Sequence, residues 1–353
     1  MTVLKLGSLF DGIGVFPLAA MHCGMEPVWA SEIEARPISI TKRHFPDMLH
    51  LGDITKISGA EIPPVDVITF GSPCQDLSQI GTRNGFAGKK SSLFYQAMRI
   101  IEEMRYATNG RYPAFTVWEN VAGAFSSNDR LDFAAMLSAF TGAEVSVPPR
   151  GWAHAGMVRG GRADTAWRLL DAQYWGEPAL VQRRKRVFVV ADFAGQRAGE
   201  VLFKPRTVLP FSAIGGPGGL SATAGSGVPA AQTGRQVPIV RPFSLRRMRT
   251  MAQVGDQKGF CASFGRGGEP FPTLLASVTA PFSFWYEGEE RDGFLRALTP
   301  LECERLMGLP ENWTKYGCKN EEISDHARYR ALGNSIALPC AEYVMAGIAE
   351  VMN

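Results

Sequence analysis

Long apolar runs, paired cysteines and a dominant charge are all absent from this sequence of 353 residues. No apolar stretch approaches the roughly 18 residues that cross a bilayer, and the N-terminal residues lead into a strand pattern rather than a signal peptide. We therefore expect a cytoplasmic protein without a membrane partner.

The six cysteines include no Cys-x-x-Cys pair, and the five histidines lie at no ligand spacing near them. This spacing predicts neither a zinc site nor a disulfide framework, so we expect no metal. The net charge of +3 is small, and a polyanionic partner would have to be bound by local basic clusters. A hydrophobic share of 45% is typical of a globular protein, and the length allows one large core and a second, smaller domain.

A strand, a glycine turn and a helix open the chain. Residues 4–10 are apolar, Asp11-Gly12-Ile13-Gly14 follows them, and a helical pattern continues to about Cys23. Glycines let the backbone approach a ligand closely, and the start of a helix offers unpaired N–H groups, as in nucleotide sites. There is no Walker lysine loop, so an adenosine ligand without a triphosphate fits better than ATP.

Two acidic residues follow the next two strand patterns. Glu32 comes about 20 residues after the glycine turn, where an acid suits the hydroxyls of a ribose. Asp53 lies in Gly52-Asp53-Ile54, where it would accept a hydrogen bond from an adenine amino group. A helix cap for Asp53 and a solvated charge for Glu32 are the alternatives. Three such loops in successive units favour the nucleotide interpretation.

The run Val65 to Phe70 predicts a central strand, and Cys74 follows it behind Pro73. Ligands in open α/β sheets bind at the carboxyl edge of the strands, so Cys74 is a candidate nucleophile. A small, inert core residue is the alternative for any single cysteine.

Two later stretches reach the same edge. A strand at residues 114–118 delivers Glu119-Asn120-Val121, and a carboxyl group there would protonate or hydrogen-bond a ring nitrogen. The run Gln182 to Arg186 leads into a strand at residues 187–190, and alternation sends Arg184 and Arg186 to one side, Arg183 and Lys185 to the other. Four cations in a row are usually a solvated edge or phosphate contacts, but arginines fixed at a strand start also reach a bound base.

In this order the motifs resemble those of the DNA cytosine-5 methyltransferases, over nearly the whole chain. The matching stretches are Phe10-Asp11-Gly12-Ile13-Gly14, Ser31-Glu32, Gly52-Asp53-Ile54, Pro73-Cys74-Gln75, Glu119-Asn120-Val121, Gln182 to Arg186 and Gly333-Asn334-Ser335. The resemblance implies an α/β fold: a Rossmann-like S-adenosylmethionine-dependent methyltransferase lobe with a mixed sheet, and a smaller, irregular target-recognition lobe.

The resemblance also implies the cofactor and the roles of residues. Cys74 would be the nucleophile, Glu119 the partner of the cytosine N3 edge, and Arg184 and Arg186 contacts to the base, with Asn120 beside them. The cofactor would be S-adenosylmethionine, leaving as S-adenosylhomocysteine. Its expected contacts are Phe10, Asp11, Gly12, Gly14, Glu32, Ile33, Asp53, Ile54, Pro73, Leu93, Asn334 and Ser335.

By the same resemblance, residues 1–192 form the catalytic domain, completed by 325–353, and 193–296 form the target-recognition domain, with 297–324 as a connection. The basic cluster of Arg246, Arg247 and Arg249 suits phosphate contacts or guanine edges, with a surface helix as the alternative. Further DNA contacts are expected at Gln75, Ser78 and Thr273. The helix expected from Thr299 to Gly308 contains Cys303, which we expect to be a packing residue.

The implied activity is methyl transfer to C5 of a cytosine flipped out of a specific duplex sequence, through a covalent bond from Cys74 to C6. Double-stranded DNA would be the partner of a monomeric, nucleoid-associated enzyme, in restriction-modification or in a phage. A transfer RNA methyltransferase, a silent DNA-binding relative and a dinucleotide oxidoreductase are the alternatives. The chain departs from the family's pattern at Ile33, where a large aromatic residue is common, and in an added loop at residues 148–165.

Overall fold

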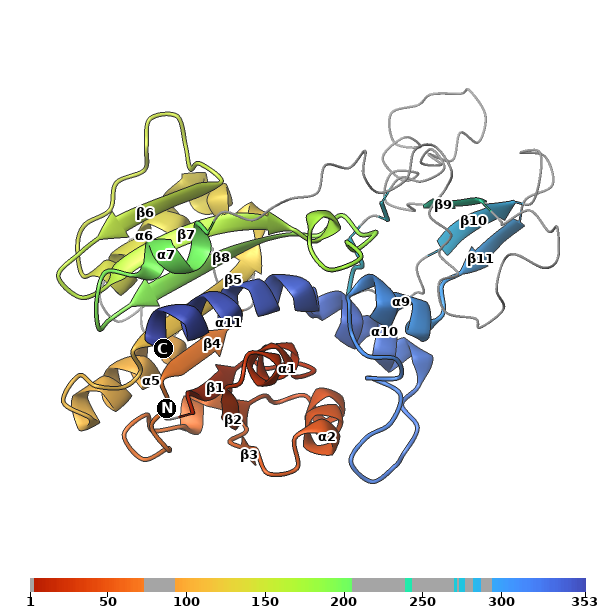
Figure 1. Ribbon diagram of the computed structural model, residues 1–353, viewed down its shortest axis with the longest axis horizontal. Coiled ribbons are helices and arrows are strands. Elements are labelled where there is room, and N and C mark those ends of the chain that lie inside the picture. Colours follow the sequence, from red (N-terminus) through yellow and green to blue (C-terminus); the bar gives the residue numbers. More distant parts are fainter. Residues whose placement is uncertain are drawn as a thin grey trace.

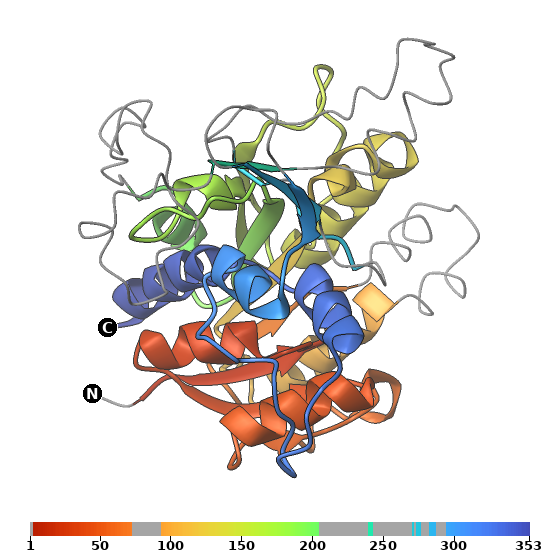
Figure 2. The ribbon, with the colours of Figure 1, turned by 90° about the vertical axis from the view of Figure 1, so that its right-hand side faces the viewer.

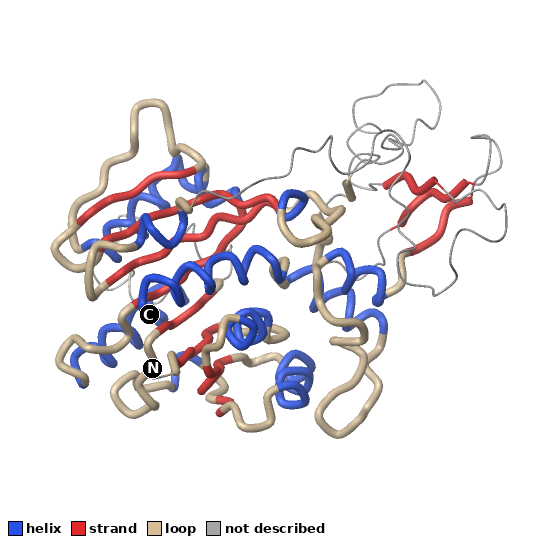
Figure 3. The backbone as a smooth tube through the Cα atoms, viewed as in Figure 1, coloured by secondary structure: helices blue, strands red, loops and turns tan. Residues whose placement is uncertain are grey.

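The structure is a computed structural model, which describes residues 3–72, 93–204, 239–242, 270–271, 273–276, 282–286 and 294–353 (Figure 3). Several residues expected at the site lie outside this part of the chain: Pro73, Cys74, Gln75, Ser78, Arg246, Arg247 and Arg249.

An eight-stranded mixed sheet forms the main lobe (Figure 1), with the strand order β3-β2-β1-β4-β5-β8-β7-β6. Neighbouring strands among β1 to β5 pair in parallel, whereas β8 runs antiparallel to both β5 and β7, and β6 antiparallel to β7. The strands are β1 Lys5–Leu9, β2 Glu26–Ser31, β3 Leu49–His50, β4 Val67–Phe70, β5 Phe115–Val121, β6 Ala155–Arg159, β7 Asp164–Asp171 and β8 Lys185–Asp192. The expected α/β class with a mixed sheet is confirmed.

Helices cover both faces of this sheet, because its central strands are apolar on both sides. On β5, Val117 packs in one core cluster with α1 and α11, and its neighbour Trp118 packs in the other with α5 and α6. The helices are α1 Val15–His22, α2 Ala35–His44, α5 Leu93–Ala107, α6 Leu131–Thr141, α7 Ala198–Leu202, α9 Pro300–Leu306, α10 Asp325–Asn334 and α11 Leu338–Met352. Short 3-10 turns lie at Ile54–Lys56, Ala122–Phe125, Ser127–Arg130 and Ala172–Tyr174.

The C-terminal part of the chain returns to the N-terminal part. Helix α11 contacts α1 on one side and α7 on the other, and Figures 1 and 2 show it between the red N-terminal elements and the green strands. Helix α7 therefore packs with the main lobe, although residues from 193 onward were expected in the recognition domain. The loop after α9 also packs there, since Trp313 Nε1 donates to the Ile13 carbonyl at 2.8 Å and its ring stacks on His44.

The expected added loop at residues 148–165 contains β6, which forms the edge of the sheet. A separate antiparallel sheet consists of β9 Ile239–Pro242, β10 Phe282–Tyr286 and β11 Phe294–Ala297. Within the described ranges, no single helix is long and apolar enough to cross a membrane; the bent pair α10 and α11 meets that test by length and composition alone.

Candidate active site

The residues expected at the site meet at one edge of the large sheet. Strands β1, β4 and β5 end side by side, with Leu9 opposite Phe70 and Phe70 opposite Trp118. Strand β8 is antiparallel, so it begins where these strands end, and Arg186 pairs with Val121. Since neighbouring strands are about 4.8 Å apart, Leu9 and Trp118, which are two strands apart, lie roughly 10 Å from each other.

Glu119 and Arg186 form an ion pair at this edge, with 2.9 Å between Oε1 and Nε. Both side chains project from the same sheet face, because Val117 and Phe188, two residues away on each strand, share one core cluster. Burial raises the pKa of the Glu119 carboxyl, against the lowering effect of Arg186 and Arg184. Glu119 Oε1 is buried, and Arg186 Nε is its charged neighbour.

The chain leaving β4 is fixed beside Glu119 by β5. The Asn120 amide donates to the Ser72 carbonyl at 2.9 Å, and Trp118 Nε1 donates to the Ser72 hydroxyl at 3.1 Å. A Cβ at Gly71 would lie only 3.2 Å from Glu119 Oε2. Ser72 is thus a positioning residue that the sequence interpretation missed, although its place two residues before the cysteine of the motif was a signal.

Arg184 precedes Arg186 by two residues in the chain. Its side chain is buried, with an exposed fraction of 1%. Its Nη1 donates to the Leu274 carbonyl at 2.8 Å, and its Nη2 donates to the carbonyls of Gly333, at 2.8 Å, and Ser335. Burial and the nearby Arg186 guanidinium lower the pKa of Arg184 well below its ordinary value. The guanidinium expected at the base is therefore engaged by backbone carbonyls.

The glycine turn after β1 presents a buried acceptor. Ser8 donates its hydroxyl proton to Asp11 Oδ1 at 2.6 Å, whereas Asp11 Oδ2 is buried and accepts no hydrogen bond. Burial raises the pKa of the Asp11 carboxyl to about 7, and the nearby Glu32 carboxyl adds to the effect. Gly12 and Gly14 have φ values of 59° and 79°, which side-chain-bearing residues rarely adopt.

Glu32 links this turn to the loop after β2. Its Oε2 accepts from the Gly12 N–H at 2.9 Å, and its Oε1 accepts from the N–H of Ile33 at 2.7 Å. The Ile33 side chain is 72% exposed, so an apolar surface faces outward beside the acid. Asp53 caps the turn at Ile54–Lys56 by accepting from Thr55, as its capping alternative predicted, and these bonds lower the pKa of Asp53.

Three of the expected cofactor contacts differ in exposure. Ile54 is a core residue, Leu93 is half-buried at the start of α5, and Asn334 is exposed at the end of α10. Arg330, one turn before Asn334, pairs with Glu34 across 2.8 Å, so this face of α10 lies against the loop after β2.

This acceptor and the apolar surface beside it fit S-adenosylmethionine. The buried, unpaired Asp11 Oδ2 suits an ammonium group, and the outward-facing Ile33 suits the face of an adenine. Among the described residues, no group of three or more histidine, cysteine, aspartate or glutamate side chains could hold a metal ion.

Of the residues expected to contact DNA, Thr273 is the one that lies within the described part of the chain. Its hydroxyl donates to the Arg183 carbonyl at 2.6 Å, so it is bonded within the protein.

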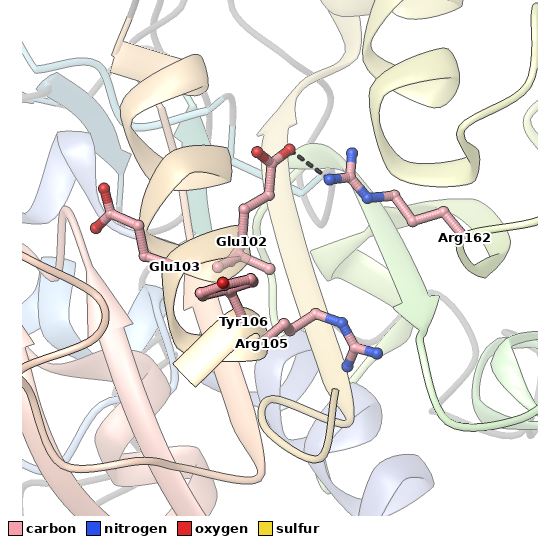
Figure 4. Close-up of a pocket in the computed structure, with 6 residues that line it drawn as sticks. Glu102, Glu103, Arg105, Tyr106 and Arg162 are labelled. Carbon is pink, nitrogen blue, oxygen red and sulfur yellow. Dashed lines mark hydrogen bonds and ion pairs between the residues drawn. The ribbon is translucent and has the colours of Figure 1, made fainter. Parts of the chain in front are cut away.

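A surface hollow of about 410 Å³ lies elsewhere, on the outer side of α5 (Figure 4). Helix α5 starts near the sheet edge that carries Glu119 and runs toward the opposite edge of the sheet. The final turns of this helix, including Tyr106, line the hollow. Arg162 in its wall is already paired with Glu102 at 2.5 Å. This hollow is therefore not the candidate site.

Comparisons with known proteins agree with this geometry. The family described as C-5 cytosine-specific DNA methylase matches residues 4–203 and 246–350. A relative from Escherichia phage P1, named a DNA N-6-adenine-methyltransferase, is 24% identical over 98% of this chain, which spans 61% of that relative's length. The type II methyltransferase M1.ScrFI of Lactococcus lactis subsp. cremoris is 26% identical over 99% of this chain and 78% of its own. The crystal structure of the S. pombe Dnmt2 methyltransferase covers 99% of both chains, with a TM-score of 0.56 and 15% identity, and shows a common fold.

Proposed function

This chain belongs to the family of C-5 cytosine-specific DNA methylases, and from that premise we propose that it methylates C5 of a cytosine in a specific duplex DNA sequence, with S-adenosylmethionine as the methyl donor. The observation that carries the proposal is the largely buried Glu119–Arg186 pair beside the chain that leads to Cys74. A dinucleotide oxidoreductase would have no use for this arrangement.

Cytosine C5 is too weak a nucleophile to be methylated directly, so a group must first add to C6. In the proposal, the Cys74 thiolate forms a bond to C6, and the electron pair of the C5–C6 double bond is displaced toward N3. Glu119 donates a proton or a hydrogen bond to N3, and its raised pKa favours the protonated form that this role requires. Arg186 holds the carboxyl in place and faces the base.

Asp11, Glu32 and Ile33 would hold the cofactor on the other side of the same edge, with Asn334 and Ser335 closing it. When bound, S-adenosylmethionine supplies a methyl group made electrophilic by its sulfonium. After transfer, a base removes the C5 proton, the electron pair of the C5–H bond re-forms the C5–C6 double bond, the Cys74 thiolate leaves, and the N3 proton returns to Glu119. The cytosine must be flipped out of the duplex, because C6 is inaccessible within the base stack.

The test is a nucleoside analysis. The protein is incubated with labelled S-adenosylmethionine and either duplex DNA or transfer RNA, and the products are digested and identified by mass spectrometry. We expect 5-methylcytosine in duplex DNA, and bisulfite sequencing then identifies the methylated sequence. N6-methyladenine would contradict the proposal and agree with the name of the phage P1 relative, and 5-methylcytosine in transfer RNA alone would favour the RNA alternative.

A further inference from the structure

Arg184 joins three parts of the chain that are far apart in sequence. Its own strand β8 carries the Arg186 that pairs with Glu119, while its guanidinium bonds the carbonyl of Leu274 on one side and those of Gly333 and Ser335 on the other. The first of these segments lies in the expected recognition region and the second in the expected cofactor site.

The two segments also touch directly. A Cβ added to Gly333 would lie 2.3 Å from the backbone of Leu275 and 2.4 Å from the backbone nitrogen of Ala276. This is closer than any side chain allows, so the backbone of residues 275–276 rests against the last turn of α10.

The recognition side is fixed to β8 by a short ladder. Phe271 exchanges backbone hydrogen bonds with the chain before β8, since its N–H donates to the Val181 carbonyl and its carbonyl accepts from the Arg183 N–H, each at 2.6 Å. Thr273 adds the hydroxyl bond to the Arg183 carbonyl. In chain order, residues 270–271 and 273–276 lie between β9 and β10, so this segment connects the small sheet, which lies in the expected recognition region, to the chain before β8.

The cofactor side is fixed by α10. The exposed Arg330–Glu34 pair connects the helix to the loop that carries Glu32 and Ile33, and Asn334 and Ser335 end the same helix. The Arg184 guanidinium thus connects the segment at Leu274, in the expected recognition region, with the segment from Gly333 to Ser335, in the expected cofactor site.

We propose that Arg184 is a positioning residue that couples the binding of DNA to the binding of the cofactor. The proposal rests on the proposed function, and it assigns to Arg184 a role through backbone carbonyls instead of contact with the base. A planar guanidinium reaches carbonyls in several directions at once, whereas a lysine ammonium on a flexible stem cannot hold all three. The Arg184→Lys variant therefore keeps the charge and removes the connection.

The test measures a coupling factor. The affinity for S-adenosylhomocysteine is determined by calorimetry on the free protein and on the protein saturated with an unmethylated duplex that contains the target sequence. The coupling factor is the ratio of the two affinities. For the unmodified chain we expect DNA to raise this affinity by a factor in the range of roughly 5 to 150 that is typical of coupled sites. In Arg184→Lys we expect the factor to fall to about 2 or less.

Arg183→Lys is the matched control, because Arg183 is exposed on the opposite side of the strand, and its factor should equal that of the unmodified chain. Where Arg184→Lys fails to fold, Thr273→Val removes the hydroxyl bond to β8 and should lower the factor in the same direction. An unmodified protein that binds both ligands independently, or folded variants with an unchanged factor, would overturn the proposal. A protein that binds no DNA would instead contradict the proposed function.

Discussion

Arg186 and Glu119 meet diagonally across the antiparallel strands β8 and β5, with 2.9 Å between Nε and Oε1. Burial raises the pKa of the carboxyl even though two guanidinium groups oppose the shift. The pair therefore combines a fixed position with a carboxyl that burial shifts toward its protonated form, and both properties can be tested by substitution.

Glu119→Gln should slow methyl transfer by about 10²- to 10⁴-fold and leave some activity, because an amide still hydrogen-bonds the ring edge but is a poor acid. In the unmodified protein, the rate should fall as the pH rises through the raised pKa of Glu119, and the variant should lack this decline. Single-turnover transfer of a labelled methyl group across pH measures both effects. Glu102→Gln, an exposed acid on α5, is the control, and an unchanged rate in Glu119→Gln would remove this residue from the mechanism.

Asp11→Asn should remove a pH dependence of cofactor binding. With a pKa of about 7, Asp11 is about one tenth ionised at pH 6 and about nine tenths ionised at pH 8. Since the ionised form binds an ammonium group better, affinity for S-adenosylhomocysteine should rise up to about tenfold over this interval. Calorimetry at both pH values is the measurement. Equal pH profiles for Asp11→Asn and the unmodified protein would place the ammonium elsewhere.

Replacement of Arg246, Arg247 and Arg249 by glutamine should weaken DNA binding and leave cofactor binding unchanged. Each lost phosphate contact should reduce the log–log salt slope of DNA affinity by roughly 0.9, whereas loss of an arginine that reads guanine should cost about 1–3 kcal/mol at one base position. DNA affinity measured across salt concentrations separates the two roles. An unchanged slope and affinity would show that the cluster is only a solvated face.

Arg328→Met should lower the free energy of unfolding by about 3 kcal/mol, because it leaves the buried Glu304 without its cation. Arg328 Nη2 donates to Glu304 Oε1 at 2.9 Å, and both side chains are nearly inaccessible. Arg330→Met on the same helix breaks an exposed pair, and its effect should stay below about 1 kcal/mol. Urea unfolding compares the two, and equal effects would show that burial of the Glu304 pair does not determine its contribution.

Much of the sheet edge that carries the candidate site could be predicted from the sequence. Short apolar runs located β1, β4 and β5, and the residues after them fall at the same edge because carboxyl ends of parallel strands align. Alternation correctly separated Arg184 and Arg186 from Arg183 and Lys185, and the structure shows that the second pair is the exposed one. Cys303 is a buried packing residue, as expected.

Contacts between residues that are far apart in the sequence could not be predicted. Alternation assigns Arg184 to a face but says nothing of what covers that face, and its partners Leu274 and Gly333 lie 90 and 149 residues away. For the same reason the contact of Trp313 with Ile13, which ties the expected connecting segment to the main lobe, has no local signal. The positions of Cys74 and of the basic cluster lie outside the described residues and stay predictions.

The most direct test of the account is to trap the bond between Cys74 and the base. In a duplex whose target cytosine carries fluorine at C5, transfer of the methyl group leaves no C5 proton to remove, so the cysteine cannot be expelled. With S-adenosylmethionine, the unmodified protein should form a covalent complex with this DNA that survives a denaturing gel, and Cys74→Ser should form none. Formation of 5-methylcytosine by the Cys74→Ser variant, or a covalent complex that persists in it, would contradict the account.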